Sequence, residues 1–440
     1  MYPIFYFPYL TSGWIIAILA TLHILPSHLV TSAMWFNVYI EWKAYKEKRE
    51  ELLEFVKKFT LLLLVFSYVF GSLSGVGIWF ATMASSPRGI SSLIHNYVWG
   101  WATEWVFFII EVLGVFVYYY TFDKVDRRTH LIIGLIFAIG AWTTMVIIVG
   151  ILSFMISTGK WIENGSFFYG FFNRNYFPHL ILRTIFMFAV TALYATFISN
   201  FVRNEITKKE IIKKASLFGT LSIVLFFPTL YVYLNSIPLQ SKEIYNLLVT
   251  PGLKIGFIIP ILLVLIYFLL NLFTNFLTKL IPSLVMIIVI FFGIFVGERI
   301  REILRKPYLI PDYVYSNGII AKDHKAKGVI SDITKVKNGN GILEIFPFTP
   351  SELKNINENN ILEAGKLVAL IECSSCHSVE KAGVRPLKYY IDKMGFDSIE
   401  TAMEFLDLMG ENYIYMPPFL GNEMEKRALA SFLISLRGSK

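Results

Sequence analysis

Long apolar stretches alternate with short polar segments over the first three hundred residues of the chain. A helix that spans a bilayer needs roughly 20 apolar residues, and this spacing makes about eight such helices possible. The predicted spans are 13–40, 56–83, 98–121, 130–157, 178–202, 216–235, 252–276 and 280–298. The pattern therefore predicts an all-α, polytopic membrane helix bundle.

The pattern changes near Tyr308. The stretch 322–359 is rich in Lys, Asp, Asn and Gly, and short amphipathic segments follow it. We therefore divide the chain into a transmembrane domain, a linker or extramembrane segment and a small α-helical C-terminal domain. Their ranges are 1–307, 308–360 and 361–440.

Composition agrees with a membrane protein, since the chain is 55% hydrophobic and only 16% charged. The formal charge of +8 comes mostly from short loops, so the positive-inside rule explains it better than nucleic-acid binding does. The basic loops are 41–58, 122–129 and 203–214. These loops should be cytoplasmic, which puts the N-terminus and, after eight spans, the C-terminal domain outside the inner membrane. Met1 to Ser12 lacks a basic region, so we expect no cleaved signal peptide.

Both cysteines of the chain lie in one pentapeptide, Cys373-Ser374-Ser375-Cys376-His377. Two thiols at this spacing attach the vinyl groups of a haem c, and the adjacent His377 becomes an axial iron ligand. A chance CxxCH or a redox CxxC is the alternative. The tail, with Met416 before two prolines and then an apolar helix, resembles the end of small monohaem cytochromes c. That resemblance makes 361–440 a cytochrome c domain and Met416 the second axial ligand, with Met409 as the alternative.

Four ionisable side chains in the spans are candidate functional residues, because such groups are costly in a membrane. In the inferred topology they lie on four different helices and at one depth, in the outer half of the bilayer. They are His23, Glu104, His179 and Glu302. Glu111 follows Glu104 by two helical turns, so we expect these two candidate catalytic carboxylates to share a helix face and carry protons inward from the outer side. Core histidines and structural carboxyls are the alternative interpretations.

These positions resemble subunit I of the cytochrome bd quinol oxidases. The first-helix His of that family, a ligand in its high-spin haem region, corresponds to His23, and its third-helix carboxylates correspond to Glu104 and Glu111. The ligand of its low-spin haem b corresponds to His179. The segment 302–308 resembles its E-x-G-R-Q-P-W motif, with Glu302 as high-spin haem ligand and Arg305 as the motif's Arg.

The resemblance covers about 1–310, and the chain departs from the family in the spacing of its third-helix carboxylates, in the seventh helix and in the loop before that helix. Where the family has an Arg followed by the Met ligand of its low-spin haem, this chain has Lys254 and then Gly256, so we expect Lys254 to replace the Arg while the Met has no counterpart. The loop 236–251 is too short to be the family's quinol-binding loop. The sequence assigns no role to His28, His95 or His130, which also lie in the membrane part of the chain.

The resemblance implies haem b in addition to haem c, and whether a haem d replaces one haem b is open. The leading hypothesis is an oxidoreductase in which electrons from soluble cytochrome c enter through haem c, pass to buried haems and reduce oxygen, together with other membrane subunits of a respiratory complex. A second hypothesis has quinol oxidised in the membrane and electrons leaving through haem c. A third is a non-enzymatic haem anchor for a periplasmic redox complex.

Overall fold

The computed structural model describes residues 1–274 and 277–437, and it confirms the all-α membrane bundle. Within this part of the chain, eight helical segments are long and apolar enough to cross a membrane. They are α1 (Ser12–Glu47), the composite segment Glu50–Ser85, α5 (Val98–Tyr120), α6 (Arg127–Phe154), α9 (Tyr176–Ser199), α10 (Glu205–Ser236), α12 (Pro251–Phe273) and α13 (Leu280–Ile303). The predicted ends of the seventh span and of the C-terminal domain, at 276 and 440, lie outside the described residues.

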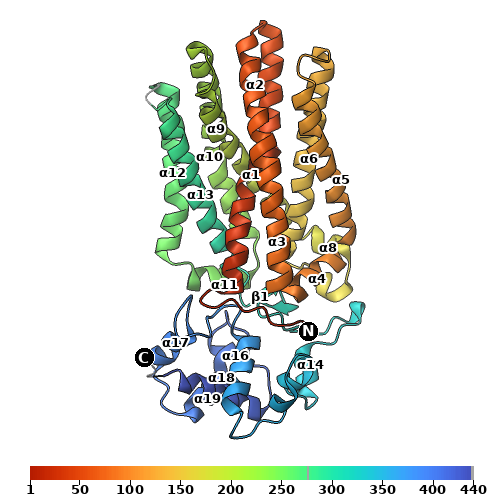
Figure 1. Ribbon diagram of the computed structural model, residues 1–440, viewed down its shortest axis with the longest axis vertical. Coiled ribbons are helices and arrows are strands. Elements are labelled where there is room, and N and C mark those ends of the chain that lie inside the picture. Colours follow the sequence, from red (N-terminus) through yellow and green to blue (C-terminus); the bar gives the residue numbers. More distant parts are fainter. Residues whose placement is uncertain (275–276, 438–440) are drawn as a thin grey trace.

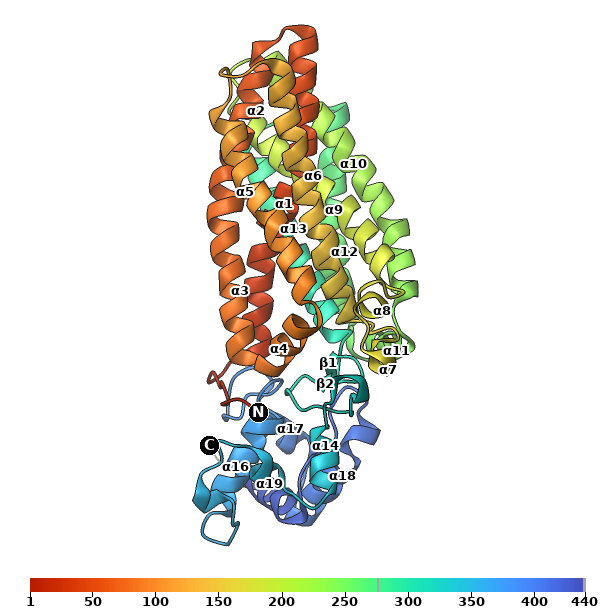
Figure 2. The same ribbon diagram turned by 90° about the vertical axis from the view of Figure 1, so that its right-hand side faces the viewer.

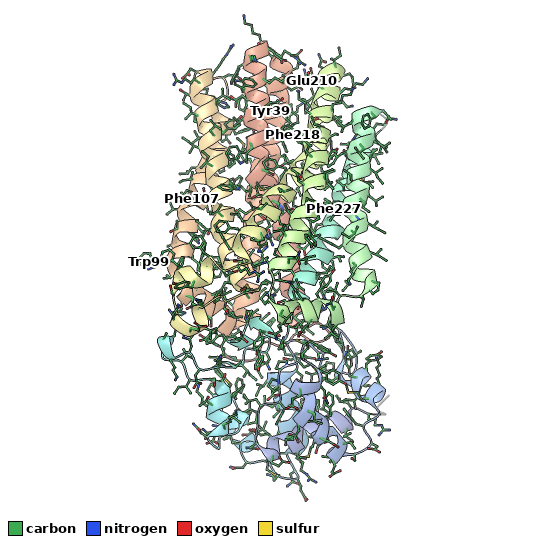
Figure 3. The ribbon with its side chains drawn as sticks, turned by 180° about the vertical axis from the view of Figure 1, so that it is seen from behind. Tyr39, Trp99, Phe107, Glu210, Phe218 and Phe227 are labelled. Carbon is green, nitrogen blue, oxygen red and sulfur yellow. The ribbon has the colours of Figure 1, made fainter. Side chains whose placement is uncertain are left out.

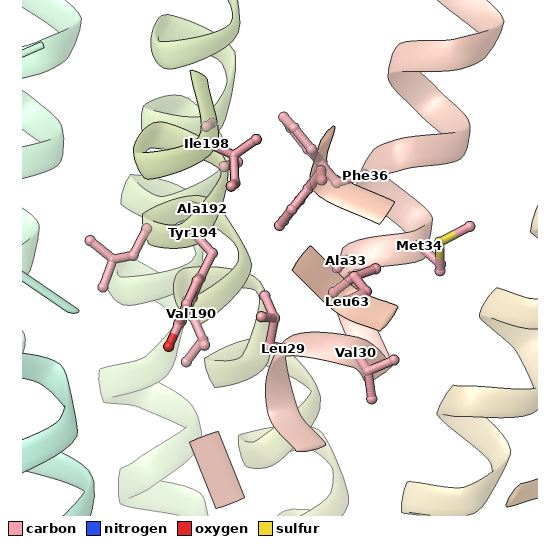
Figure 4. Close-up of a cluster of buried hydrophobic side chains, with 14 of the residues drawn as sticks. Leu29, Val30, Ala33, Met34, Phe36, Leu63, Val190, Ala192, Tyr194 and Ile198 are labelled. Carbon is pink, nitrogen blue, oxygen red and sulfur yellow. The ribbon is translucent and has the colours of Figure 1, made fainter. Parts of the chain in front are cut away.

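The bundle is arranged around α1. Figure 1 shows α9, α10, α12 and α13 on one side of this helix and α3 (Gly71–Ser85), α5 and α6 on the other. Leu29 and Phe36 of α1 and Val190 and Tyr194 of α9 belong to the large buried core, and Figure 4 shows these side chains between the two helices. Because α1 contacts both halves, its side chains can reach a site on either side.

Several helices extend further than their apolar stretches predict. α1 continues to Glu47 and α10 begins at Glu205, which is about two and three turns, respectively, beyond the predicted spans. Ion pairs explain this extension, because Lys43 and Arg49 both contact Glu210 at the start of α10. Figure 3 shows Glu210 at the end of the bundle farthest from the C-terminal domain. Contacts between Lys57 and Asp123 and between Lys58 and Phe201 bring the three basic loops together at that end.

The second span is not a uniform α-helix. It consists of α2 (Glu50–Leu62), a π-helical segment η1 (Leu63–Phe70) and α3 (Gly71–Ser85). The π-helical turns are wider than α-helical ones and are frequent next to functional residues. Here they precede the small residues that contact His23.

Shorter helices cover the end of the bundle near the C-terminal domain. They are α4 (Pro87–Asn96), α7 (Trp161–Asn164), α8 (Phe167–Phe171) and α11 (Leu239–Leu248). Proline at the first position of α4 suits a helix start, since that residue needs no backbone N–H partner. The view in Figure 2 shows α4 and α11 above the C-terminal elements.

The chain beyond α13 forms a helical unit on the same side as the N-terminus (Figure 1). It begins with a small antiparallel pair, β1 (Tyr308–Ile310) and β2 (Val314–Tyr315). The helices that follow are η2 (Lys325–Lys327), α14 (Asp332–Lys337), α15 (Ile342–Ile345), η3 (Ser351–Leu353), α16 (Ile361–Glu372), α17 (Leu387–Met394), α18 (Ile399–Asn412) and α19 (Glu423–Ser435). This unit has its own apolar core, which includes Val368, Leu406 and Leu429.

Candidate functional site

The Cys373–His377 segment lies directly after α16. The backbone N–H of His377 donates to Cys373 O at 2.9 Å, and its Nδ1 lies 3.0 Å from Arg385 O. A backbone acceptor at Nδ1 selects the tautomer in which Nε2 keeps its lone pair, as an axial iron ligand requires. Burial lowers the pKa of His377 to about 4, which keeps the imidazole neutral. Two thiols and this imidazole fit a covalently bound haem.

Two helices cross closely beside this segment. A Cβ added at Gly365 of α16 would lie 2.0 Å from Ala428 O of α19, so only glycine permits this approach. The buried carboxylate of Glu372, which ends α16, accepts the backbone N–H of Leu420 at 3.2 Å. Between α18 and α19, the half-buried Met416 follows a turn in which its N–H donates to Tyr413 O.

The predicted haem c segment touches the membrane bundle. Lys306, three residues after α13, places its Nζ 3.0 Å from Cys376 Sγ. A Cβ at Gly13, in the first turn of α1, would lie 3.1 Å from Glu302 Oε1 and 3.8 Å from Ser375 O. The carboxylate of Glu302 also forms an ion pair with Arg299. The ends of α1 and α13 and the pentapeptide therefore meet at one place.

Further contacts fix the C-terminal unit to the bundle. The N-terminal segment lies between the bundle and this unit (Figure 1), where the N–H of Val384 donates to Tyr9 O at 2.8 Å. On another side, Arg88 of α4 forms an ion pair with Asp332 of α14, whose side chain is 1% exposed. The Nη1 of Arg88 also donates to Gly318 O at 3.0 Å. The unit is thus held at several separate points.

His23 of α1 faces α3. Its Nδ1 lies 3.0 Å from Gly71 O and 3.4 Å from Ser74 Oγ, and a Cβ at Gly75 would lie 3.1 Å from its Cε1. The small residues Gly71, Ser74 and Gly75 thus make room for this imidazole, and a haem ligand with an anchored Nδ1 is chemically reasonable here.

His179 lies at a cavity of about 190 Å³ between α1, α9, α10, α12 and α13. The cavity is also lined by Lys254, which was predicted, and by three charged residues that were not, Arg183, Glu298 and Arg301. The Nε–H of Arg183 donates to His179 Nε2 at 2.8 Å, and its Nη2 lies 3.2 Å from Glu298 Oε1.

The cavity can hold a haem by its chemistry. Its walls are mostly apolar, as a porphyrin ring prefers. The lining includes three cations but one carboxylate, so a surplus of positive charge is available for propionates. Arg301 Nη1 and the Nε of the adjacent Arg305 are buried without a hydrogen-bond partner, which is unusual for guanidinium groups and points to an anionic partner.

The two carboxylates on α5 differ in their surroundings. Glu111 is 4% exposed and accepts hydrogen bonds from Thr144 and, at 3.5 Å, from the Tyr68 hydroxyl of η1. Glu104 is half-buried two turns away. Two turns beyond Glu111 on α5, the Tyr118 hydroxyl donates to Glu41, which also contacts His130 Nδ1. Polar groups thus follow one face of α5 toward the end with the basic loops.

The structure separates some residues that the sequence placed together. Glu302 lies beside Gly13, whereas His23 is ten residues further along α1, about 15 Å at 1.5 Å per residue. The prediction of one shared depth is therefore wrong for this pair. Arg183 and Glu298 were not predicted from the sequence. Their four-residue spacings from His179 and Glu302 place each on the same helix face as a predicted residue, and this signal could have identified them.

No protein-family model matches the sequence, and no curated protein matches it either. Among solved structures, the fold is similar to one titled "The structure of bd oxidase from Geobacillus thermodenitrificans", with a TM-score of 0.59 and 12% sequence identity. The match covers 73% of this chain and 90% of that chain. The likeness confirms the bd-like fold expected from the sequence, and the C-terminal cytochrome c domain stays a prediction.

Proposed function

We propose that the chain is a subunit of a bd-like membrane oxidoreductase that takes electrons from soluble cytochrome c through its own haem c and reduces oxygen. The observation that carries this proposal is the contact between the Cys373–His377 segment and the end of α13. Lys306 Nζ lies 3.0 Å from Cys376 Sγ and 3.9 Å from Glu302 Oε1. A single lysine thus touches a predicted haem c attachment point and a predicted ligand of a buried haem.

Each set of residues has a definite task in this proposal. Cys373, Cys376 and His377, with Met416, would hold haem c, and a thioether opposite an imidazole favours a high reduction potential. Glu302 would hold the haem that reacts with oxygen, while His23, about 15 Å away along α1, and His179 would hold further haems. When bound, the haems supply one-electron transfer and oxygen chemistry.

The protein residues supply protons and orientation. Glu111, fixed by Thr144 and Tyr68, would pass protons along α5 to the half-buried Glu104. The chain of polar groups continues to Glu41 and His130 at the end that carries the basic loops. That continuation supports proton entry from the cytoplasmic side, opposite to the direction expected from the sequence.

The proposed location is the inner membrane, with the C-terminal unit on the periplasmic side. The three basic loops lie together at the opposite end of the bundle, as the positive-inside rule requires. Large apolar side chains such as Leu73, Phe80 and Trp99 are exposed on the bundle, as expected of surfaces that face lipid or other membrane subunits.

Oxygen uptake by the purified full-length chain tests the function. We expect uptake with reduced cytochrome c and none with menaquinol alone. The Cys373→Ser/Cys376→Ser double variant should lose this uptake and keep its extractable haem b. Menaquinol-driven reduction of haem c without oxygen uptake would instead establish the outward direction of flow, and an inactive, haem-loaded protein would establish an anchor subunit.

A further inference from the structure

The two histidines of α1 face opposite sides of the helix. They are five residues apart, which places their side chains about 140° apart around the axis. His23 contacts α3 through Gly71 O, whereas His28 lines the cavity that His179 also lines. His28 therefore belongs with His179 and not with His23.

The Nε2 atoms of His28 and His179 both contact the guanidinium of Arg183. The Nδ1–H of His28 donates to Ile24 O at 2.9 Å, which leaves a lone pair on Nε2. The Nε2 of His179 accepts the Nε–H of Arg183 at 2.8 Å, and Nη1 of the same guanidinium lies 3.4 Å from His28 Nε2. Two imidazole lone pairs thus converge on one cation from α1 and α9. A metal ion bound between them would use the same two lone pairs.

Burial makes it costly to leave these two Nε2 lone pairs without a partner. His28 is 6% exposed and His179 is 3% exposed, so water cannot readily replace Arg183 as the partner of their Nε2 lone pairs. Arg183 also contacts Glu298, so its guanidinium keeps a partner when it moves away from the imidazoles. The position between the histidines can therefore be vacated without stranding a buried charge.

The other side chains around the cavity leave few ligands to choose from. Among the described residues that line it there is no Met and no Cys, so the lining offers no sulfur ligand for iron. Lys254 is directed to the ring of Tyr245, 4.8 Å from its centroid. The two histidines are the neutral nitrogen donors of the lining. Arg301 contacts Glu298 through Nε and Nη2, and its unpartnered Nη1 is available for a propionate.

We infer that His28 and His179 are the two axial ligands of one low-spin haem b in this cavity. The inference rests on the proposed function, which places a haem at His179, and it adds the second ligand. A second imidazole in place of a thioether gives this haem a lower reduction potential than a Met-ligated one. α1 would then serve two haems, one from each face.

The test compares His28→Ala and His28→Met in the full-length protein, purified with its haems. Pyridine haemochrome spectra count haems b and c, and electron paramagnetic resonance and near-infrared magnetic circular dichroism report the axial ligands. We expect His28→Ala to convert one low-spin haem b into a high-spin one that returns to low spin when imidazole is added. His28→Met should stay low-spin, move its near-infrared band from the bis-imidazole to the imidazole–thioether position, and titrate at a higher midpoint potential.

His95→Ala is the matched control, because His95 is an exposed histidine of α4 and should leave every signal unchanged. An unchanged low-spin haem b in both His28 variants would overturn the inference and leave the proposed function standing. Wild-type protein without extractable haem b would instead overturn the proposed function as well. Quinone co-purifying with the wild type and lost in His28→Ala, with the haem spectra unchanged, would assign the cavity to quinone. If His28→Ala also loses its haem c spectrum, it is misfolded and His28→Met decides.

Discussion

The ion pair between Arg88 and Asp332 should be a main attachment of the C-terminal unit to the bundle. Asp332 is 1% exposed at its side chain and Arg88 16%. Removing one partner of a buried pair costs about 3–5 kcal/mol, and a hydrogen bond to a charged group contributes about 1.5–3 kcal/mol. Asp332→Asn keeps an acceptor for the Ile320 N–H, and Arg88 retains some contact with water. We therefore expect Asp332→Asn to lower the free energy of unfolding by about 2 kcal/mol.

Thermal unfolding of the C-terminal unit, followed by fluorescence and by protease sensitivity of 308–360, measures this loss. For a unit of this size, each kcal/mol lowers the midpoint by roughly 4 °C, so Asp332→Asn should melt about 8 °C lower. Asp407→Asn is the matched control, because Asp407 pairs with Lys426 while 55% exposed. Such surface pairs contribute less than about 1 kcal/mol. Equal midpoints for the two variants would refute the argument.

The same pair gives a pH dependence with a definite sign. Burial raises the pKa of Asp332, but the hydrogen bonds and charge of Arg88 lower it more, so the net shift is downward. The pair's contribution to the free energy of unfolding is therefore complete above the unfolded-state Asp pKa of about 3.9, and it is lost as the pH falls through the lower folded-state pKa. Wild type and Asp332→Asn should differ by a constant amount from pH 7 to 5 and converge in stronger acid. A difference that persists there would contradict the assignment.

Three further predictions concern the haem c unit and the proton groups. Met416→Ala should lower the haem c midpoint potential in a redox titration, whereas Met409→Ala should leave it unchanged. Gly365→Ala places a Cβ 2.0 Å from a backbone oxygen, so it should lower the free energy of unfolding by at least about 1–3 kcal/mol and reduce haem c content. In the control Gly256→Ala, the Cβ meets Val296 at an ordinary 3.7 Å, so stability and haem c content should be unchanged. Glu111→Gln should slow oxygen uptake while the haem spectra stay unchanged, and altered spectra would mean a structural role.

The number and order of the spanning helices could be predicted from sequence because lipid imposes a strict length and polarity on each helix. Helix ends could not, because the extra turns of α1 and α10 depend on Glu210 meeting Lys43 and Arg49, residues far away in the sequence. The π-helical segment before Gly71 was equally hidden, since Leu63–Phe70 is an unremarkable apolar run whose wider turns depend on packing against neighbouring helices.

The candidate residues show the same division. The haem c pentapeptide could be identified without any fold, because its chemistry is contained in five adjacent positions. His28 could not be assigned, since the angle between it and His23 excludes a shared haem but does not say what lies on the other face of α1. That answer required α9, which brings His179 and Arg183 to His28.

The two kinds of axial ligation set a condition on the direction of electron flow. A haem between two imidazoles has a lower potential than haem c with Met416, so electrons from haem c do not reach oxygen favourably through the His28–His179 cavity. Lys306 contacts both Cys376 and Glu302. This contact offers another route for electrons, from haem c directly to the haem held by Glu302. Inward flow therefore requires that the haem held by Glu302 titrate above haem c. If it titrates below both haem c and the haem between His28 and His179, the same structure would carry electrons outward.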